Sequence, residues 1–412
     1  MDGQVIVVGA SLAGWRTAEA LRREGHRGRI TLVGAEPQLP YDRPPLSKQF
    51  LTDEWEEAKL ALARDGVESV GAEWRLGEAA VSLDVATRAV RLANGERLEG
   101  ADVVVIATGA RARRLPFGHD LEGVLELRTQ ADALALRRAM ATASRVVVVG
   151  AGFIGMELAA SCRTRGLEVD VVDPLPAPLV RGLGPVLGER VAERHRREGV
   201  RFHLETGVEG FEGEDRVRAV RLTDGRRLPA DVVLVGIGAV PAIEWLEDSG
   251  LELDDGVCCD ANGFTGHEGI YAVGDCARWA NVHYPGRPRF EHWTSAVEQA
   301  GVVARRIVGG APVEHAPIPY VWTDQFDLRI AIAGEVREGD AMHVCLGRLE
   351  EDRFLALFGR DERLVGAVGF KRPRQLNACR RRIAEGVAFR DAIAEFDDSV
   401  AAEAKADAAS HG

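Results

Sequence analysis

The 412-residue sequence predicts an α/β protein with two Rossmann-like dinucleotide-binding modules and a C-terminal α+β domain that contains an antiparallel sheet. Two glycine-rich loops each follow an apolar strand, at residues 5–14 and 146–157. In each case a second apolar strand follows after about twenty residues and ends near an acidic residue, as in dinucleotide-binding units. Further along, residues 90–110 are echoed by residues 220–239. The chain therefore contains two related modules.

The first module opens with the run VIVVGASLAG at residues 5–14, which predicts a strand, a phosphate-binding turn and the start of a helix. Gly9 permits the tight turn and Gly14 lets the helix pack on the strand, whereas Ser11 replaces the usual second glycine. The next strand, 29–34, is followed by Glu36, the expected partner of a ribose 2′-hydroxyl.

A proline-rich segment follows this strand, LPYDRPPLSK at residues 39–48. Its two adjacent prolines restrict the backbone, which is also typical of a rigid surface loop. Arg43 and Lys48 would balance the charge of an anionic ligand, and Ser47 is suited to cap a short helix.

The second module carries a full G-x-G-x-x-G motif at Gly150, Gly152 and Gly155, directly after four valines. Its glycines allow a tight turn, a close approach to a pyrophosphate and close packing of the helix, whose N-terminus favours an anion. The strand 168–173 ends in Asp173, the second candidate ribose acid.

The internal repeat predicts a hairpin and a buried strand in each module. Asn94-Gly95 and Asp224-Gly225 are typical of type I′ turns. Each copy continues into an apolar strand that runs into a glycine, Gly109 or Gly238.

The rest of the chain predicts a short strand at 270–277 that contains Gly274-Asp275, a helix at Trp293–Ile307 and a C-terminal domain. In that domain, alternating apolar residues predict antiparallel strands, followed by a basic amphipathic helix at 375–387. The predicted strands are 329–336, 343–349, 354–358 and 364–370.

Composition excludes several classes of function. Apolar residues make up 46% and charged residues 28%, as in ordinary globular proteins, and the net charge of −12 argues against general nucleic-acid binding. No apolar run reaches the roughly eighteen residues that span a bilayer, and no secretory signal is recognisable, so we expect a cytoplasmic protein. The six cysteines show no C-x-x-C spacing, which predicts reduced thiols and no metal site.

The chain resembles NADH-dependent ferredoxin reductases of bacterial P450 and Rieske oxygenase systems, within the glutathione-reductase-like flavoprotein superfamily. The resemblance covers roughly residues 5–395. Beyond the glycine loops, its specific motifs are LPYDRPPLSK at 39–48, ATG at 107–109, LRT at 127–129, VGDCA at 273–277, EQ at 298–299 and YVWTDQ at 320–325.

The resemblance implies that the two modules are nested. An FAD-binding domain at 1–113 would be interrupted by an NADH-binding domain at 114–245 and would resume at 246–318. A C-terminal interface domain would follow at 319–396, with a disordered tail at 397–412.

The same resemblance implies the cofactor-binding residues by position. For FAD they are Gly9, Ala10, Ala13, Gly14, Glu36, Arg43, Lys48, Ala80, Thr108, Gly109, Arg128, Gly274, Asp275, Trp293 and Trp322. For NADH they are Gly150, Gly152, Phe153, Ile154, Gly155, Asp173, Gly236, Ile237 and Gly238.

Lys48 and Glu157 are the implied catalytic residues, expected to meet beside the flavin and tune it. The helix that begins near Trp293 is expected to place its N-terminus where negative charge develops. Two simpler interpretations compete: Glu157 as a solvated residue on a helix face, and Trp322 as a core residue at a domain boundary.

The expected activity is hydride transfer from NADH to FAD, followed by release of single electrons to a [2Fe-2S] ferredoxin that feeds an oxygenase. The sequence has no C-x-x-x-x-C in the first module and no cysteine near the PPLS segment, so we expect no disulfide relay. Two alternatives are an NADH-sensing flavoprotein like apoptosis-inducing factor, and a reductase of rubredoxin or of a small radical such as monodehydroascorbate.

An acidic ferredoxin would need a local basic surface on this acidic protein. Candidate docking residues are Arg305 and Arg306 on one helix and Arg380 and Arg381 on another. The alternative interpretation is that these arginines form ordinary solvated faces.

Overall fold

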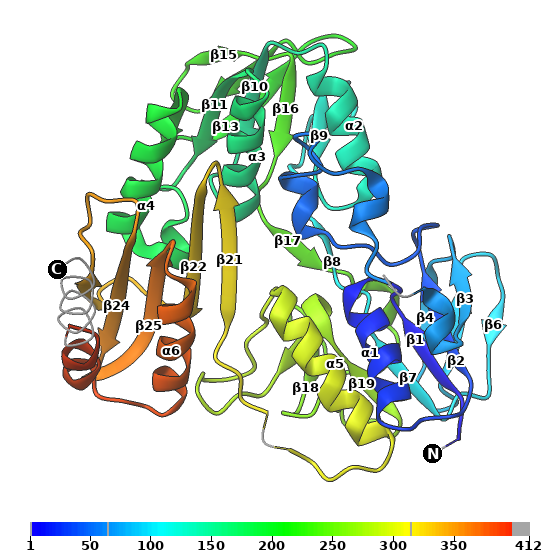
Figure 1. Cartoon of the computed structure of the whole chain (residues 1–412). Coiled ribbons are helices and arrows are strands. Elements are labelled where there is room, and N and C mark those ends of the chain that lie inside the picture. The colour runs from blue at the N-terminus through cyan, green and yellow to red at the C-terminus, as the bar shows by residue number, and fades with distance from the viewer. Residues whose placement is uncertain (1, 64–65, 314, 398–412) are drawn as a thin grey trace. The chain divides into compact units, whose positions relative to one another are not determined.

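The computed structural model describes residues 2–63, 66–313 and 315–397 and divides into two compact units (Figure 1). The first unit comprises Met1–Arg43, Glu56–Arg111 and Ala239–Pro317, and the second comprises Pro44–Trp55, Ala112–Gly238 and Ile318–Gly412. The predicted disordered tail lies outside the described residues, apart from Asp397.

A five-stranded parallel sheet forms the centre of the first unit, in the order β19-β7-β1-β2-β3. β1, β2 and β7 are buried along their full length and apolar except for Thr31, as strands of a sheet covered on both faces are. The bounds are β1 Val5–Val8, β2 Ile30–Gly34, β3 Glu73–Leu76, β7 Val103–Ile106 and β19 Ile270–Ala272.

Two long helices of the first unit, α1 (Leu12–Arg23) and α5 (Trp293–Ile307), lie side by side (Figure 1). Small sheets and short 3₁₀ turns complete the unit. The strands are β4 Ala80–Asp84, β5 Ala89–Leu92 and β6 Arg97–Leu98 in one sheet, β18 Val257–Cys259 with β20 Ala277–Trp279, and β8 Ala110–Ala112 with β17 Ala239–Pro241.

The second unit repeats the same parallel arrangement, in the order β12-β11-β10-β16-β9. Its strands are β9 Val124–Glu126, β10 Arg145–Val149, β11 Glu168–Asp173, β12 Val200–Leu204 and β16 Val232–Val235. Its helices are α2 Gln130–Met140, α3 Phe153–Thr164 and α4 Val180–Arg197, and a small sheet contains β13 Val208–Glu212, β14 Ala219–Leu222 and β15 Arg227–Pro229.

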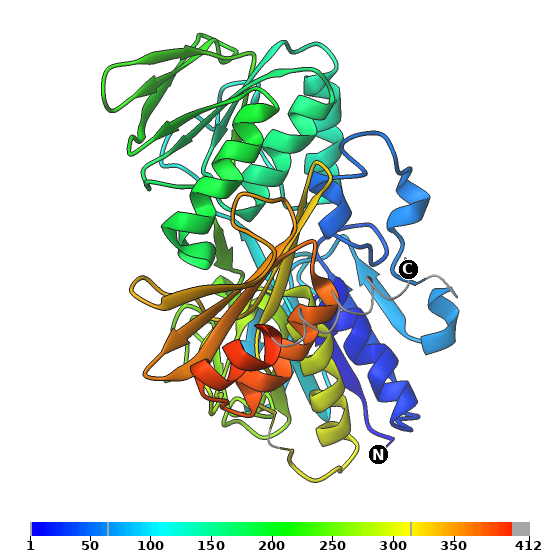
Figure 2. The same cartoon turned by 60° about the vertical axis from the view of Figure 1, so that its left-hand side comes forward.

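The C-terminal segment forms a five-stranded antiparallel sheet with α6 (Pro373–Ala384) against it, drawn in colours from yellow-gold to orange-red in Figure 2. Its strands are β21 Tyr320–Gln325, β22 Leu328–Gly334, β23 Ala341–Leu346, β24 Phe354–Arg360 and β25 Arg363–Phe370. Ile330 and Phe354 of this sheet share one buried cluster with Val148 and Leu183 of the parallel module.

Both repeated hairpins form where the sequence predicts them, but their turns are not type I′. Gly95 has φ +90° and Gly225 has φ +85°, whereas Asn94 and Asp224 do not have the positive φ that a type I′ turn requires. The Gly95 amide donates to the Leu92 carbonyl, and the Asn94 side chain accepts from the Glu96 amide at 2.8 Å. The asparagine therefore closes a local side-chain turn, and only the glycine adopts the left-handed conformation.

A buried ion-pair cluster joins β11 to β12. The carboxylate of Asp170 accepts hydrogen bonds from Arg201 at 3.0 and 2.8 Å and from Nε2 of His203 at 2.8 Å. An Arg226 guanidinium group lies 2.9 Å from Nδ1 of His203. Because guanidinium only donates, Nδ1 accepts and the proton of neutral His203 resides on Nε2.

We predict that Asp170→Asn destabilises the second unit by about 1–2 kcal/mol at pH 7. Burial alone would raise the pKa of Asp170, but the bonds from His203 and Arg201 bring it down to about 2. The carboxylate therefore contributes stability above the unfolded pKa near 4, and this contribution is lost as the pH falls toward 2. Urea unfolding of parent and variant should show a difference that shrinks between pH 4 and pH 2. A difference that does not change over this range would contradict the assignment.

No helix within residues 2–63, 66–313 and 315–397 is long and apolar enough to cross a membrane. The same described residues contain no group of three or more His, Cys, Asp or Glu side chains placed to hold a metal ion.

Candidate dinucleotide and redox site

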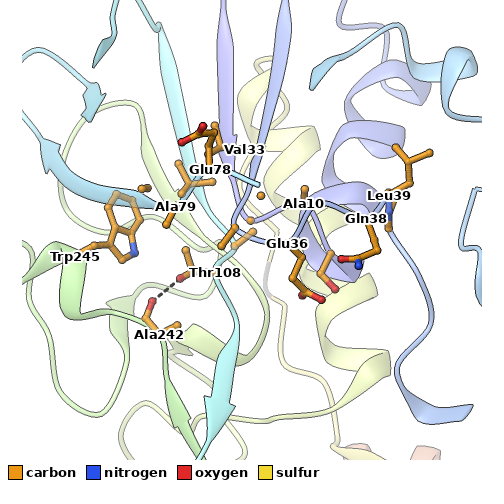
Figure 3. A pocket seen from close by; sticks show the side chains of 18 of the residues that line it. Ala10, Val33, Glu36, Gln38, Leu39, Glu78, Ala79, Thr108, Ala242 and Trp245 are labelled. Carbon is orange, nitrogen blue, oxygen red and sulfur yellow. Dashed lines mark hydrogen bonds between the residues drawn. The ribbon is translucent and has the colours of Figure 1, made fainter. Parts of the chain in front are cut away.

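A cavity of about 550 Å³ opens in the first unit where β1, β2 and β7 end (Figure 3). Ligands of open parallel sheets bind at this edge, outside the carboxyl ends of the strands. Six of the residues predicted for FAD line it: Gly9, Ala10, Glu36, Arg43, Ala80 and Thr108.

The glycine loop of the first unit brings backbone close to backbone. Gly9 has φ +119° and donates its N–H to the Val33 carbonyl at 2.7 Å. A Cβ atom on Gly9 would overlap the carbonyl oxygen of Ala107, and one on Gly14 would overlap the carbonyl oxygen of Gly9. Both positions therefore require glycine, one for the turn and one for the helix contact.

Glu36 is held at the end of β2 by two donors. Arg43 donates to one carboxylate oxygen at 2.5 Å, and the Tyr41 hydroxyl donates to the other at 2.5 Å. Arg43 also reaches the Ser11 hydroxyl at 3.3 Å. The predicted ribose acid and the arginine predicted to balance an anionic ligand thus meet beside the glycine loop.

The second unit contains an equivalent loop. Gly150 has φ +102° and donates to the Val172 carbonyl at 2.8 Å, as Gly9 does to Val33. A Cβ atom on Gly150 would overlap the Gly236 carbonyl, and one on Gly155 would overlap the Gly150 carbonyl. Around Gly152 no atom lies within 4 Å of the position a Cβ would take, so the loop is open there.

Asp173 lies at the end of β11 but differs from Glu36 in its partners. Its side chain accepts from the backbone amide of Ala151 at 2.6 Å and from that of Leu175 at 2.8 Å. Only 9% of the residue is exposed. The carboxylate therefore also fixes the glycine loop itself, which spacing alone did not predict.

The other residues predicted for NADH surround this loop. Phe153 and Ile154 begin α3, and Ile154 is 43% exposed. Gly236 donates to the Val149 carbonyl at 2.8 Å, and Ile237 packs against the cluster that includes Val149. Gly238 has φ +107°.

Glu157 is buried on α3, with 4% of the residue exposed. Its carboxylate accepts from the Ser47 hydroxyl, from the Lys48 ammonium at 3.1 Å, from the Thr323 hydroxyl at 2.8 Å and from the Asp324 amide at 3.3 Å. The interpretation of Glu157 as a solvated helix-face residue is therefore wrong. Four donors from two distant segments fix its position.

Lys48 bridges two carboxylates, Glu157 and Asp324, the latter at 3.5 Å. Asp324 also pairs with Arg329 at 2.8 Å. The exposed fraction of the side chain rises from 5% at Glu157 to 10% at Lys48, 26% at Asp324 and 52% at Arg329. A cavity of about 470 Å³, lined by Lys48 and Asp324 among others, borders this chain of charges.

The remaining residues predicted for FAD divide between the two units. In the first, Gly274 packs against Ala13, Gly109 has φ +67°, and the indole of Trp293 donates to Asp42 at 2.9 Å. The carbonyl of Asp275 accepts from Arg289 at 3.2 Å.

Lys48, Arg128 and Trp322 belong to the second unit. The amide of Arg128 donates to Asp132, whose capping box with Thr129 starts α2, so the LRT motif also has a structural role. The ring of Trp322 lies 6.2 Å from that of Tyr320, centroid to centroid.

Sequence reasoning did not assign the polar residues that hold these charged groups. Tyr41 lies within a segment singled out for its charges, and Thr323 and Asp324 lie within the YVWTDQ motif, so the positions were visible but their roles were not. Ser47 was interpreted as a helix cap, yet its hydroxyl contacts Glu157.

All six cysteines lie within the described residues, and each is a buried free thiol. Burial raises the pKa of Cys162 and of Cys345 to about 12 and raises that of Cys276 as well. No cysteine lines the cavity of the first unit. These thiols are therefore poorly suited to act as nucleophiles or as a redox pair.

Comparison with known proteins identifies two family regions. Residues 3–300 match the family described as pyridine nucleotide-disulphide oxidoreductase, and residues 320–403 match the family described as reductase C-terminal. The chlorobenzene dioxygenase ferredoxin reductase component of Cupriavidus sp. (strain PS12) is 38% identical over 405 residues, which is 97% of each chain.

Two solved structures are similar over nearly the whole chain. The ferredoxin reductase for the CYP199A2 system of Rhodopseudomonas palustris has a TM-score of 0.90 and 34% identity, and the match covers 95% of this chain and 97% of that one. Putidaredoxin reductase in its covalent complex with putidaredoxin has a TM-score of 0.89 and 31% identity, with 94% of each chain covered.

The first-unit cavity fits the FAD that this family binds. The loop at Gly9 has no space for a side chain, so a pyrophosphate can approach its backbone closely. Glu36 can accept from a ribose hydroxyl and Arg43 can balance the phosphate charge. Ala80 lines the wall of the cavity. The second loop, at Gly150, repeats the backbone geometry of the first. The chain therefore belongs to the pyridine nucleotide-disulphide oxidoreductase family, as an FAD-dependent oxidoreductase with a reductase C-terminal domain.

Proposed function

We propose that this protein is an NADH:ferredoxin reductase that delivers electrons to a [2Fe-2S] ferredoxin serving a P450 or Rieske oxygenase in the cytoplasm. FAD supplies the chemistry, since it takes a hydride from NADH and gives up electrons singly. The names of the relatives support this acceptor, because a dioxygenase component and the reductase of a named P450-type system both match over almost the whole chain.

The state of the cysteines carries the proposal. Disulfide reductases pass electrons through a cysteine pair, whereas here all six thiols are buried and unpaired, and none of them lines the FAD cavity. Electrons must then leave for an external carrier without a dithiol intermediate. A one-electron iron–sulfur protein fits that requirement.

In this proposal the two loops have separate tasks. The loop at Gly9, with Glu36 and Arg43, holds FAD, and the loop at Gly150, with Asp173, holds NADH. Lys48 and Glu157 are the catalytic pair. FAD would occupy residues 1–113 and 246–318, NADH residues 114–245, and residues 319–396 would form the interface domain.

Stopped-flow spectroscopy tests the function directly. Anaerobic protein is mixed with NADH, the loss of flavin absorbance is followed, and the product is then mixed with an oxidised [2Fe-2S] ferredoxin. We expect rapid reduction by NADH and rapid bleaching of the ferredoxin. Slow reoxidation by ferredoxin together with NADH-dependent dimerisation would instead support a sensing flavoprotein. Faster reduction of rubredoxin or monodehydroascorbate than of ferredoxin would instead identify one of these as the electron acceptor.

We predict that the donor is NADH rather than NADPH. We also predict that Asp173→Asn narrows the difference in kcat/KM between the two donors. A buried carboxylate repels a 2′-phosphate but accepts a hydrogen bond from a free 2′-hydroxyl. The variant should raise KM for NADH about tenfold, because its amide also places a donor against the Ala151 or Leu175 amide. Initial rates with both donors measure this. Equal kcat/KM for NADH and NADPH in the parent would contradict the prediction.

The structure refines the proposed docking surface. Lys371 is paired with Asp327, and Arg382 with Glu385 and Glu395, so much of the C-terminal charge is neutralised. Arg380 donates to the Ile318 carbonyl at 2.7 Å. Arg305 and Arg381 are exposed at the ends of α5 and α6, and they are the better candidates for contact with an acidic partner.

We predict that Arg305→Glu and Arg381→Glu each lower kcat/KM for ferredoxin several-fold at low salt, with a smaller effect at physiological salt. Charges on a docking surface act mainly on encounter rates, which salt screens. Reduction of ferricyanide and reduction of FAD by NADH should be unchanged. Arg348→Glu is the control, since Arg348 is a 79% exposed arginine after β23. Ferredoxin kinetics equal to the parent at every salt concentration would rule out Arg305 and Arg381 as docking residues.

A further inference from the structure

One wall of the FAD cavity is formed by an aromatic residue that the sequence did not assign to a site. Trp245 lies on the short 3₁₀ turn Glu244–Leu246 and lines the cavity together with Glu78, Ala79, Ala80 and Val81. Figure 3 shows its indole beside Ala79, at the opposite side of the cavity from Glu36. The other residues of this wall are Ala79, Ala80 and Val81, which are aliphatic, and Glu78.

The turn that carries Trp245 is fixed to the end of β7. The amide of Ala242 donates to the Gly109 carbonyl at 2.9 Å, and the Thr108 hydroxyl donates to the Ala242 carbonyl at 2.7 Å. Glu244 forms an ion pair with Arg111. Because Ala242 and Glu244, just before Trp245, are anchored in this way, the indole is positioned before any ligand binds.

The neighbouring wall indicates which part of FAD reaches Trp245. Glu36 is the acid expected to bind the ribose of the adenosine half. The amide of Gly77 donates to the Glu36 carbonyl at 3.1 Å and that of Glu78 to the Gly34 carbonyl at 3.0 Å. The segment 77–81 therefore runs beside the ribose acid, and a base attached to that ribose would lie between this segment and Trp245.

Within the described residues, the side chain of Trp245 lacks a hydrogen-bond acceptor for its indole N–H. Its indole nitrogen is closed off from solvent and has no hydrogen-bond partner there. A tryptophan used only for packing usually finds an acceptor for this N–H. The ring face, rather than the N–H, is the part of the side chain that can meet a ligand.

We propose that Trp245 is an adenine-stacking residue that sets the affinity for FAD, with Ala79, Ala80 and Val81 forming the opposite wall. This inference rests on FAD as the cofactor and is independent of the identity of the acceptor. Base–aromatic stacking predicts that its removal weakens binding of FAD by about tenfold or more.

Titration of FAD into the deflavinated full-length protein tests this, with ADP as a second probe that carries adenine but no flavin. Trp245→Leu should raise the Kd for FAD and for ADP by the same factor, and Trp245→Phe, which keeps an aromatic face but no N–H, should stay within about threefold of the parent. The control Trp74→Leu removes a ring that stacks on Trp15, outside the cavity lining, and should leave both constants unchanged.

Three results would overturn the proposal. The first is a Kd for FAD in Trp245→Leu equal to that of the parent. The second is loss of FAD affinity without loss of ADP affinity, which would place the effect away from adenine. The third is a loss in Trp245→Phe as large as in Trp245→Leu, which would assign the effect to the N–H. None of these results depends on whether ferredoxin is the acceptor.

Discussion

Gly9→Ala is expected to yield protein that purifies with less than a tenth of the FAD of the parent. Two costs combine at this position. The φ of +119° is unfavourable for alanine, and the new Cβ would overlap the carbonyl oxygen of Ala107, which is backbone and cannot swing away. The loop between β1 and α1 must then shift, and the cavity wall formed by Gly9 and Ala10 moves with it. The ratio of flavin to protein absorbance measures the result.

Gly25→Ala separates the cost of a positive φ from the cost of a Cβ that overlaps backbone. Gly25 also has a positive φ, +90°, but no atom lies within 4 Å of the position its Cβ would take. This variant should lose about 1 kcal/mol of stability and keep its full FAD content. If both variants retain FAD, the Gly9 loop is not the cofactor cradle. If both lose it, the effect is a general loss of stability rather than closure of the loop.

The parallel modules were predictable because their signals are local. Four consecutive apolar β-branched residues, a glycine turn and a helix start occur within about twelve residues, and the two copies reinforce each other. The structure places Gly9 and Gly150 in the same conformation with equivalent hydrogen bonds to Val33 and Val172. The helix predicted at Trp293–Ile307 has these same bounds in the structure.

Other elements, such as α4 and β21, have no local sequence signal of this kind. α4 contains Gly184 with φ +73° and then Pro185, so the helix is broken and its sequence suggests a loop. β21 contains Thr323 and Gln325, which are fully buried polar residues, and therefore lacks the alternation of a half-exposed strand. Its burial depends on contacts with α3, which lies more than 150 residues earlier in the sequence.

The surroundings of the site were the least predictable part. The resemblance implied a meeting of Lys48 with Glu157, which are 109 residues apart, and their distance is 3.1 Å. It did not imply the hydroxyl donors, because serine and threonine occur throughout the sequence and only the fold selects Ser47 and Thr323. The double role of Asp173 was hidden for the same reason, since its partners are backbone amides.

Glu157→Gln is expected to slow reduction of FAD by NADH about 100-fold, the size of effect seen when one preorganised hydrogen-bonding group is removed from an active site. The carboxylate holds Lys48 at 3.1 Å and accepts from Thr323 and the Asp324 amide through the same oxygen. The neutral amide leaves Lys48 with a single carboxylate partner, Asp324 at 3.5 Å. The proposed function assigns Lys48 to the flavin, and its positive charge would then be less compensated, so the midpoint potential of bound FAD should move to a more positive value.

A matched variant on the same helix distinguishes a catalytic from a structural role. Ser161 lies one turn after Glu157 and is about equally buried, and its hydroxyl donates to the Ser47 carbonyl at 2.6 Å rather than to the carboxylate of Glu157. Ser161→Ala should lower the unfolding free energy by about 1 kcal/mol and leave the reduction rate and potential near those of the parent. Glu157→Gln should lower stability as well, because it disturbs four donors, but its kinetic effect should far exceed that of Ser161→Ala. If both variants lose stability while both keep the parental reduction rate and potential, Glu157 only joins segments 44–55 and 320–325 to α3, and the proposed catalytic pair is wrong.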